Sequence, residues 1–192
     1  SSVAKALNTI ILGAPGGGKG TISKKIVKAF NFDHISTGDI VRDNINQGSE
    51  LGKIAVSYVN KGELVPGSHL ANMLGDYIKT KRPPRVLLDG YPRTLQQVQD
   101  LKEILEVDLV INLDIPHETI VDRISERLIH PPSNRVYNLT YHPPKVPGKD
   151  DLTGEDLIRR PDDEPEAVRS RLKDYVNMTM PLLEHYENHS PG

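Results

Sequence analysis

Residues 13–21, Gly-Ala-Pro-Gly-Gly-Gly-Lys-Gly-Thr, constrain the fold more than any other stretch of the sequence. The apolar run 10–12 precedes them, and a segment with helical character, 21–30, follows. Glycines at such a turn allow backbone N–H groups to surround phosphate oxygens, and the next helix directs its positive dipole end there. The pattern G-x-x-x-x-G-K ends at Lys19, with the usual hydroxyl displaced by one residue to Thr21. We therefore predict a site for nucleotide phosphates.

The composition excludes several classes of function. The 192 residues contain 24 Lys and Arg against 26 Asp and Glu, so nothing indicates bulk binding to nucleic acid or to an anionic membrane. No apolar run approaches the roughly 18 residues of a membrane span. The chain has no cysteine, which excludes disulfides and thiolate metal sites. We expect a globular protein with no nucleic-acid partner and no membrane segment.

Buried strands alternate with helical segments along most of the chain. This alternation predicts an α/β fold, a doubly wound parallel sheet of the P-loop NTPase type. In such sheets the loops at the carboxyl ends of the strands hold the ligand. The strands are expected at residues 9–12, 33–35, 85–89 and 108–113.

Two stretches interrupt the alternation. Residues 36–66 read as a small helical insertion, and residues 128–160, rich in proline and without a helical period, read as an ordered lid. A last long helix is expected from Asp163 to about Glu187, kinked at Pro181. The core would then consist of the remaining parts of the chain, 1–35, 67–127 and 161–192.

An aspartate and a set of arginines are the candidates for chemistry on phosphate. Asp89 ends an apolar strand, where an acid would face the phosphate loop and a magnesium ion, directly or through water. Phosphoryl transfer needs cations that clamp the developing charge, and the planar guanidinium binds phosphate in a bidentate manner. No obvious general base accompanies them, which favours a phosphate over a hydroxyl as the acceptor. The arginines at element edges are Arg42, Arg93, Arg127, Arg160 and Arg171, and Arg123 lies one helical turn before Arg127 on the same face.

Several runs of the sequence together resemble the adenylate kinase family. The similarity covers nearly the whole chain in the family's order, and the long lid resembles the long-lid branch. It implies an enzyme that transfers the terminal phosphoryl group of a nucleoside triphosphate to AMP, with Mg²⁺ as cofactor, in a monomer. The runs are 13–21, Ser36-Thr-Gly-Asp-Ile-Val-Arg42, Leu88-Asp-Gly-Tyr-Pro-Arg-Thr94, 127–137, Asp150-Asp-Leu-Thr-Gly-Glu155, 160–163 and Arg171.

The resemblance implies a role for each matching position. Catalysis would fall to Lys19, Arg93, Arg127, Arg160 and Arg171, and Asp89 would order magnesium, through water. The triphosphate would contact Gly16, Gly17, Gly18, Lys19, Gly20, Thr21, Arg123, Arg127 and Tyr137. AMP would contact Ser36, Thr37, Arg42, the backbone from Gly62 through Glu63 and Leu64 to Val65, Gly90, Arg93, Gln97, Arg160 and Arg171. Residues 36–66 thereby become the AMP-binding insertion.

The lid departs from its metal-binding relatives. His130, Ser133, Asp150 and Thr153 occupy positions where other lids carry four cysteines around zinc, and we expect a polar network without zinc. Asn134 replaces a turn glycine, which asparagine can do because it tolerates positive φ. The family continues past the last helix into a final strand, and that segment is missing from these 192 residues.

The donor nucleotide and the compartment rest on finer similarity. The runs 106–113, 136–138 and 162–165 resemble mitochondrial-matrix GTP:AMP phosphotransferases, whereas 127–130 and 149–153 also occur in ATP-using relatives. We expect GTP as the donor and a matrix location, with ATP and the cytoplasm as alternatives. An inactive nucleotide-binding fragment remains a further alternative, and a GTPase-like switch lacks its Asn-Lys-x-Asp run.

Overall fold

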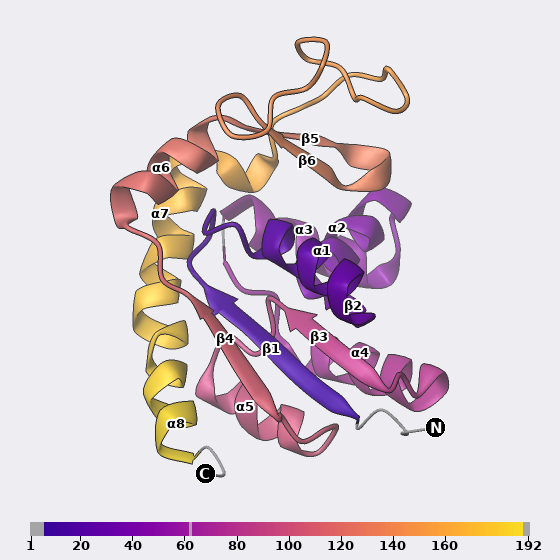
Figure 1. Ribbon diagram of the computed structural model, residues 1–192, viewed down its shortest axis with the longest axis vertical. Helices are drawn as coiled ribbons and strands as arrows, with labels where there is room; N and C mark the ends of the chain where they lie inside the picture. The colour runs from indigo at the N-terminus through magenta and orange to yellow at the C-terminus, as the bar shows by residue number, and fades with distance from the viewer. Residues whose placement is uncertain (1–5, 62, 190–192) are drawn as a thin grey trace.

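The computed structural model describes residues 6–61 and 63–189, arranged around a parallel sheet (Figure 1). Four strands lie in the order β2-β3-β1-β4, and every pairing is parallel. Ile11 of β1 pairs with Asp89 of β3, so the strand that leads into the glycine loop lies beside the strand that ends in the candidate acid. Within the described residues the sheet ends at β4. The strands are β1 (Leu7–Gly13), β2 (Asp33–Ser36), β3 (Arg85–Asp89) and β4 (Leu109–Leu113).

Alternate residues of β1 pack on opposite faces of the sheet, as a doubly wound sheet requires. Ile10 and Leu12 face a core cluster that includes Leu74 of α4 (Gly67–Lys81) and Leu101 of α5 (Leu95–Lys102). Ile11 faces the other way, into a cluster formed with α1 (Lys19–Phe30). The predicted α/β architecture is therefore confirmed.

The insertion after β2 consists of helices α2 (Thr37–Gln47) and α3 (Glu50–Lys61). Ser36 is the N-cap of α2, because its side chain accepts a hydrogen bond of 3.2 Å from the backbone N–H of Asp39. The two helices pack closely at Gly52, where a Cβ atom would lie 2.1 Å from the carbonyl oxygen of Asn44.

A hairpin and long loops form the lid, seen at the top of Figure 1. Helix α6 (His117–Ser125) leads into β5 (Arg127–His130), which pairs antiparallel with β6 (Arg135–Asn138) after a single 3₁₀ turn. From residue 139 to 160 the chain forms turns and isolated bridges, such as Ile129 with Ile158. The lid is thus loop-rich, as its proline content indicates.

The expected single helix over 163–187 is wrong in detail. The structure has α7 (Pro165–Asp174), a π-helical turn (Tyr175–Thr179) and α8 (Pro181–His189). Proline has no N–H and its ring clashes with the preceding turn, so the helix widens before Pro181 and the Met180 N–H bonds to the Tyr175 carbonyl at 2.8 Å. None of the described helices is long and apolar enough to cross a membrane.

Candidate active site

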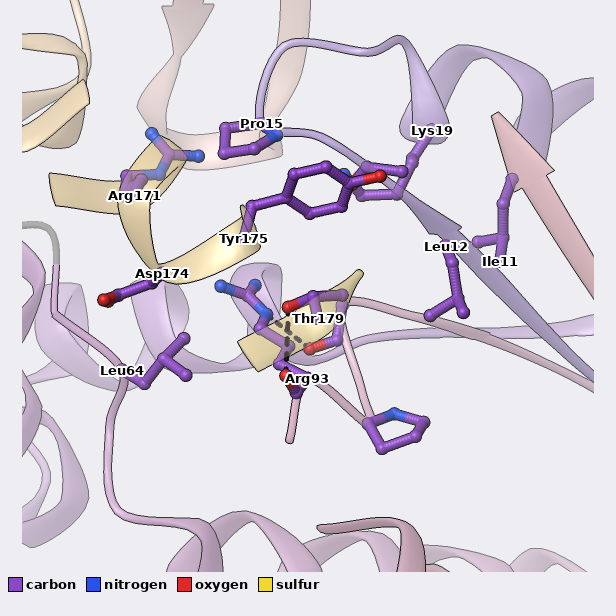
Figure 2. Close-up of a pocket in the computed structure, with 13 residues that line it drawn as sticks. Ile11, Leu12, Pro15, Lys19, Leu64, Arg93, Arg171, Asp174, Tyr175 and Thr179 are labelled. Atoms are coloured by element: carbon purple, nitrogen blue, oxygen red, sulfur yellow. Dashed lines mark hydrogen bonds between the residues drawn. The ribbon is translucent and has the colours of Figure 1, made fainter. Parts of the chain in front are cut away.

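Two open pockets meet above the carboxyl ends of β1 and β3. The first has a volume of ≈ 510 Å³ and adjoins the glycine loop, α7 and the π turn (Figure 2). The second has a volume of ≈ 640 Å³ and lies against α2 and the end of α3. The two pockets share four lining residues, Leu64, Gly90, Arg93 and Arg171. Of the residues predicted to contact the triphosphate, Lys19 is the one that lines the first pocket, whereas most of those predicted to contact AMP line the second. Arg160, also predicted for AMP, lines neither pocket.

The glycine loop is formed as the sequence predicts. Gly16 and Gly18 have φ of 76° and 86°, and a Cβ atom on Gly16 would lie 2.5 Å from the Ile124 side chain, so other residues are excluded there. Helix α1 begins at Lys19, which places Gly20 and Thr21 in its first turn. The Thr21 N–H donates to the Gly18 carbonyl at 3.0 Å, and the first turn of α1 is the positive end of its helix dipole.

Lys19 folds back over its own loop. Its Nζ atom donates hydrogen bonds to the carbonyls of Gly13 at 2.7 Å and Ala14 at 2.9 Å. Loss of hydration in this crowded site lowers the pKa of Lys19 to about 7, and the negative charge of Asp89 opposes that shift only in part. A bound phosphate would restore the charge on this ammonium group.

Arg93 is held from three sides. Its backbone N–H donates to Gln97 Oε1 at 2.7 Å, and its Nε donates to the Gly90 carbonyl at 2.7 Å. The Thr179 hydroxyl donates to the Arg93 carbonyl at 2.9 Å, as Figure 2 shows. Burial lowers the pKa of Arg93 to about 10, and the nearby charge of Arg171 adds to that effect. Thr179 was not identified from the sequence, because no motif marks it.

The other arginines are oriented by the acids of 161–163. Arg127 Nε donates to Asp163 at 2.7 Å, and a second bond from Nη2 makes the pair bidentate. Arg171 Nη1 donates to the Asp162 carbonyl at 2.8 Å and lies 2.9 Å from its carboxylate. Burial opposes the charge of Arg127, but the hydrogen bond and charge of Asp163 outweigh it and raise the pKa of Arg127. These contacts fix the guanidinium groups before any phosphate is bound.

Among the candidate arginines, Arg160 is the one whose positive charge is least compensated by neighbouring groups. Burial lowers the pKa of Arg160 to about 9, and repulsion from Arg42 and Arg127 adds to the shift. Its Nε has no hydrogen-bond partner within the described part of the chain. A buried donor without a partner is costly, and an anion between these cations would satisfy it.

The second pocket brings together most of the residues expected to contact AMP. Thr37, Arg42, Glu63, Leu64, Val65, Gly90, Arg93, Gln97 and Arg171 all line it. Ser36 does not, because its side chain caps α2. Arg42 pairs with Asp39 at 2.5 Å, which turns the guanidinium back along α2. Gly62 lies outside the described residues.

The environment of Asp89 fits a hard cation held mainly by phosphates and waters. The side chain is buried at the end of β3, and His34 Nε2 lies 3.7 Å from its carboxylate. Burial raises the pKa of this carboxyl, but His34, Lys19 and Arg93 together outweigh it and leave the pKa below its usual value. Magnesium sites that involve nucleotides need one or two carboxylates of this kind.

Arg123 lies between the loop and the lid. Its guanidinium is close to Gly18, with Nη1 3.6 Å from the position of a Cβ atom there. Its Cζ atom also lies 5.1 Å from the ring centroid of Tyr141 in the lid, a cation–π arrangement. Tyr141 is exposed and was not identified from the sequence. The guanidinium group therefore lies between the glycine loop and the lid, and it does not line the first pocket.

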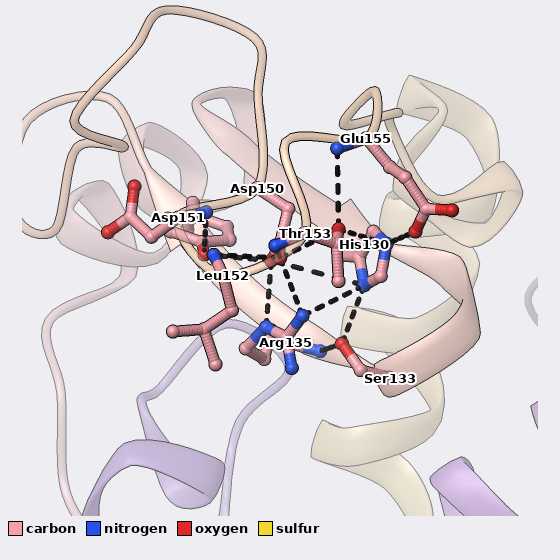
Figure 3. Close-up of polar contacts among 9 residues, drawn as sticks. His130, Ser133, Arg135, Asp150, Asp151, Leu152, Thr153 and Glu155 are labelled. Atoms are coloured by element: carbon pink, nitrogen blue, oxygen red, sulfur yellow. Dashed lines mark hydrogen bonds and ion pairs between the residues drawn. The ribbon is translucent and has the colours of Figure 1, made fainter.

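The polar lid network extends beyond the four residues predicted for it (Figure 3). His130 is buried, with Nδ1 2.7 Å from Ser133 Oγ and Nε2 2.5 Å from Glu155 Oε2. Asp150 is the most connected member. It accepts hydrogen bonds from both Arg135 nitrogens, the Thr153 hydroxyl and N–H, the Leu152 N–H and the Tyr137 hydroxyl.

The network has consequences for zinc and for Tyr137. In the described part of the chain no three His, Cys, Asp or Glu side chains gather closely enough to hold a metal ion. The zinc-free lid stays a prediction, supported by the engagement of Asp150 with Arg135. Tyr137 is 2% exposed, and its hydroxyl also accepts from the Asp151 N–H at 2.9 Å. Its side chain therefore serves the lid interior and could reach a triphosphate only if the network opened.

Comparison with known proteins agrees with this arrangement. The family model described as adenylate kinase matches residues 11–191. The chain is 46% identical over 183 residues to a protein of Drosophila melanogaster named "GTP:AMP phosphotransferase, mitochondrial". That match covers 95% of this chain and 85% of the fly protein. The chain therefore belongs to the adenylate kinase family and is a nucleoside monophosphate kinase.

Proposed function

We propose that this enzyme transfers the terminal phosphoryl group of GTP to AMP, giving GDP and ADP, as a monomer in the mitochondrial matrix. The donor and the compartment follow the name of the fly relative. The observation that carries the two-nucleotide reaction is the junction of the pockets at Arg93 and Arg171. The junction is where the transferred group would pass from donor to acceptor.

In this proposal the glycine loop and Lys19 bind the phosphates of the triphosphate. Arg123 stacks on the donor base, and the 128–160 lid covers it. The 36–66 insertion holds AMP, with Arg42 and Arg93 on its phosphate. The core of the chain, 1–35, 67–127 and 161–192, stays in place between them.

The chemistry is in-line displacement assisted by positioned cations. An AMP phosphate oxygen is already ionised at neutral pH, so it attacks without a general base. Arg127, Arg160 and Arg171 would stabilise the charge that develops on the equatorial oxygens. Magnesium, when bound near Asp89, would neutralise charge on the donor phosphates. Closure of both insertions would exclude water and prevent hydrolysis of the triphosphate.

The donor assignment is tested by initial rates with GTP, ATP and ITP at a fixed AMP concentration. We expect kcat/KM for GTP to exceed that for ATP. A higher value for ATP would make the enzyme an ATP:AMP phosphotransferase. Triphosphate hydrolysis without AMP-dependent ADP formation would contradict the two-nucleotide reaction itself.

A further inference from the structure

One hydrogen bond joins the lid to the AMP-binding insertion across the opening of the pockets. Asn134 Nδ2, in the turn between β5 and β6, donates to Asp43 Oδ1 on α2 at 2.7 Å. The two residues are 91 positions apart, and both side chains are half-buried. Within the described parts of 36–66 and 128–160, no other hydrogen bond or ion pair joins the two insertions.

The backbone at Asn134 indicates that its side chain has a function. Its φ is 53°, in the left-handed region that glycine adopts without strain. Asparagine accepts this conformation, yet glycine would be the less strained residue if only the turn mattered. The hydrogen bond with Asp43 offsets the backbone strain that a side chain causes at this φ.

Each partner of the hydrogen bond is adjacent in sequence to residues with other contacts in its own insertion. Asn134 lies between Ser133 and Arg135, which both belong to the lid network. Asp43 follows Arg42 on α2, and Arg42 lines the pocket expected to hold AMP. A movement of α2 that places Arg42 on a phosphate would therefore also carry Asp43 to the position where Asn134 meets it.

Electrostatics explains why such a bond is needed. In this structure Arg42 and Arg127 lie near enough to Arg160 for their repulsion to contribute to its lowered pKa. When only one nucleotide is bound, part of this repulsion is uncompensated. A hydrogen bond to a carboxylate outside the cation cluster opposes it without adding positive charge.

We propose that the Asn134–Asp43 hydrogen bond is a latch that couples AMP binding to lid closure. Both are positioning residues, which stabilise the closed arrangement without touching the reacting atoms. The coupling part of this inference rests on the proposed AMP site in the 36–66 insertion. The latch itself rests only on the contact between the insertions.

The chain has no cysteine, so two introduced cysteines report closure by single-molecule energy transfer. S57C on α3 and K145C on the lid replace exposed residues. N134G and D43A should each lower the closed-to-open ratio about fivefold, the factor that corresponds to the usual net value of one hydrogen bond. N134G should also raise the KM for AMP by a similar factor without lowering kcat.

Two controls separate the latch from other effects. N31G changes an asparagine with φ of 54° that caps α1, so it reports the backbone effect of glycine alone and should leave closure unchanged. The exchange N134D/D43N reverses the donor and acceptor and should restore closure. N134D alone places two carboxylates together and should lower the closed-to-open ratio further than N134G does.

The outcomes decide the proposal separately from the reaction. If N134G, D43A and their combination have additive effects, or if the exchanged pair is as open as N134D, the latch is overturned. These ratios are measured first without nucleotide and then with AMP. If AMP fails to shift the ratio in the parent protein, the coupling of AMP binding to closure is overturned, while the nucleotide-free ratios still test the hydrogen bond itself. A KM for AMP that R42A leaves unchanged would instead show that the proposed AMP site is wrong.

Discussion

At the scale of single residues, Lys19 shows how a binding site is prepared for its ligand. Its pKa of about 7 means that the ammonium group is only partly charged near neutral pH in the free protein. Triphosphate oxygens beside Nζ would favour the charged form and raise that pKa. Binding should therefore be coupled to proton uptake.

We expect GTP binding at pH 8 to take up nearly one proton, because Lys19 would change from mostly neutral to charged. The measurement is calorimetric titration in HEPES and in Tris, whose ionisation enthalpies differ. K19R is the matched variant, since arginine stays protonated and should bind GTP without proton uptake. Equal uptake by K19R would assign the proton to another group.

Residue identities were predictable where a motif encodes them. The spacing up to Lys19 predicted the glycine loop and the helix after it, and both are present in the structure. The contact of Asn134 with Asp43 could not be predicted, because it depends on how two insertions 91 positions apart meet in space. Burial of Tyr137 was missed for the same reason.

At the scale of elements, the π turn before α8 is the main difference from the sequence prediction. The sequence predicted a kink at Pro181. It did not predict how the widened turn rotates the residues before the proline. In the structure this turn directs the Thr179 hydroxyl at the Arg93 carbonyl, 86 positions away. Thr179 therefore connects the last helices to the loop that carries a proposed catalytic arginine.

We expect T179V, which keeps the shape but removes the hydroxyl, to lower kcat/KM about fivefold. The loss corresponds to about 1 kcal/mol, the usual net value of one hydrogen bond. Steady-state kinetics with AMP as the varied substrate provides the measurement. T179S should restore activity, and T140V, at an exposed lid position, should have no effect. A T179S enzyme as slow as T179V would show that packing, rather than the hydroxyl, matters.

At the scale of the whole molecule, the lid and the core are stabilised by different forces. The core clusters around β1 are apolar, whereas the lid depends on polar contacts that converge on Asp150. The hydrogen bond from Arg135 holds the pKa of Asp150 well below its usual range, although burial opposes the shift. The charge of Asp150 thus stabilises the lid above the ordinary aspartate pKa of about 4, and this contribution is lost as the pH falls below it.

We therefore expect acid to open the lid before the core. Protection factors for amide exchange, which correct for the slower intrinsic exchange in acid, should fall in residues 128–160 below about pH 4 while those of β1 and β3 stay high. D150N should show the faster exchange already at neutral pH. D156N removes an exposed carboxylate paired with Lys149 and should behave as the parent protein. Simultaneous loss of protection in lid and core would contradict this division.

The separation of lid and core also bears on how such proteins diverge. In the described part of the chain, the side chains that form hydrogen bonds or ion pairs with Asp150 or His130 all come from residues 130–155. Substitutions within this stretch can compensate one another without disturbing the phosphate loop or the sheet. The lid is therefore a module in the evolutionary sense, free to exchange one internal chemistry for another while the rest of the enzyme keeps its own.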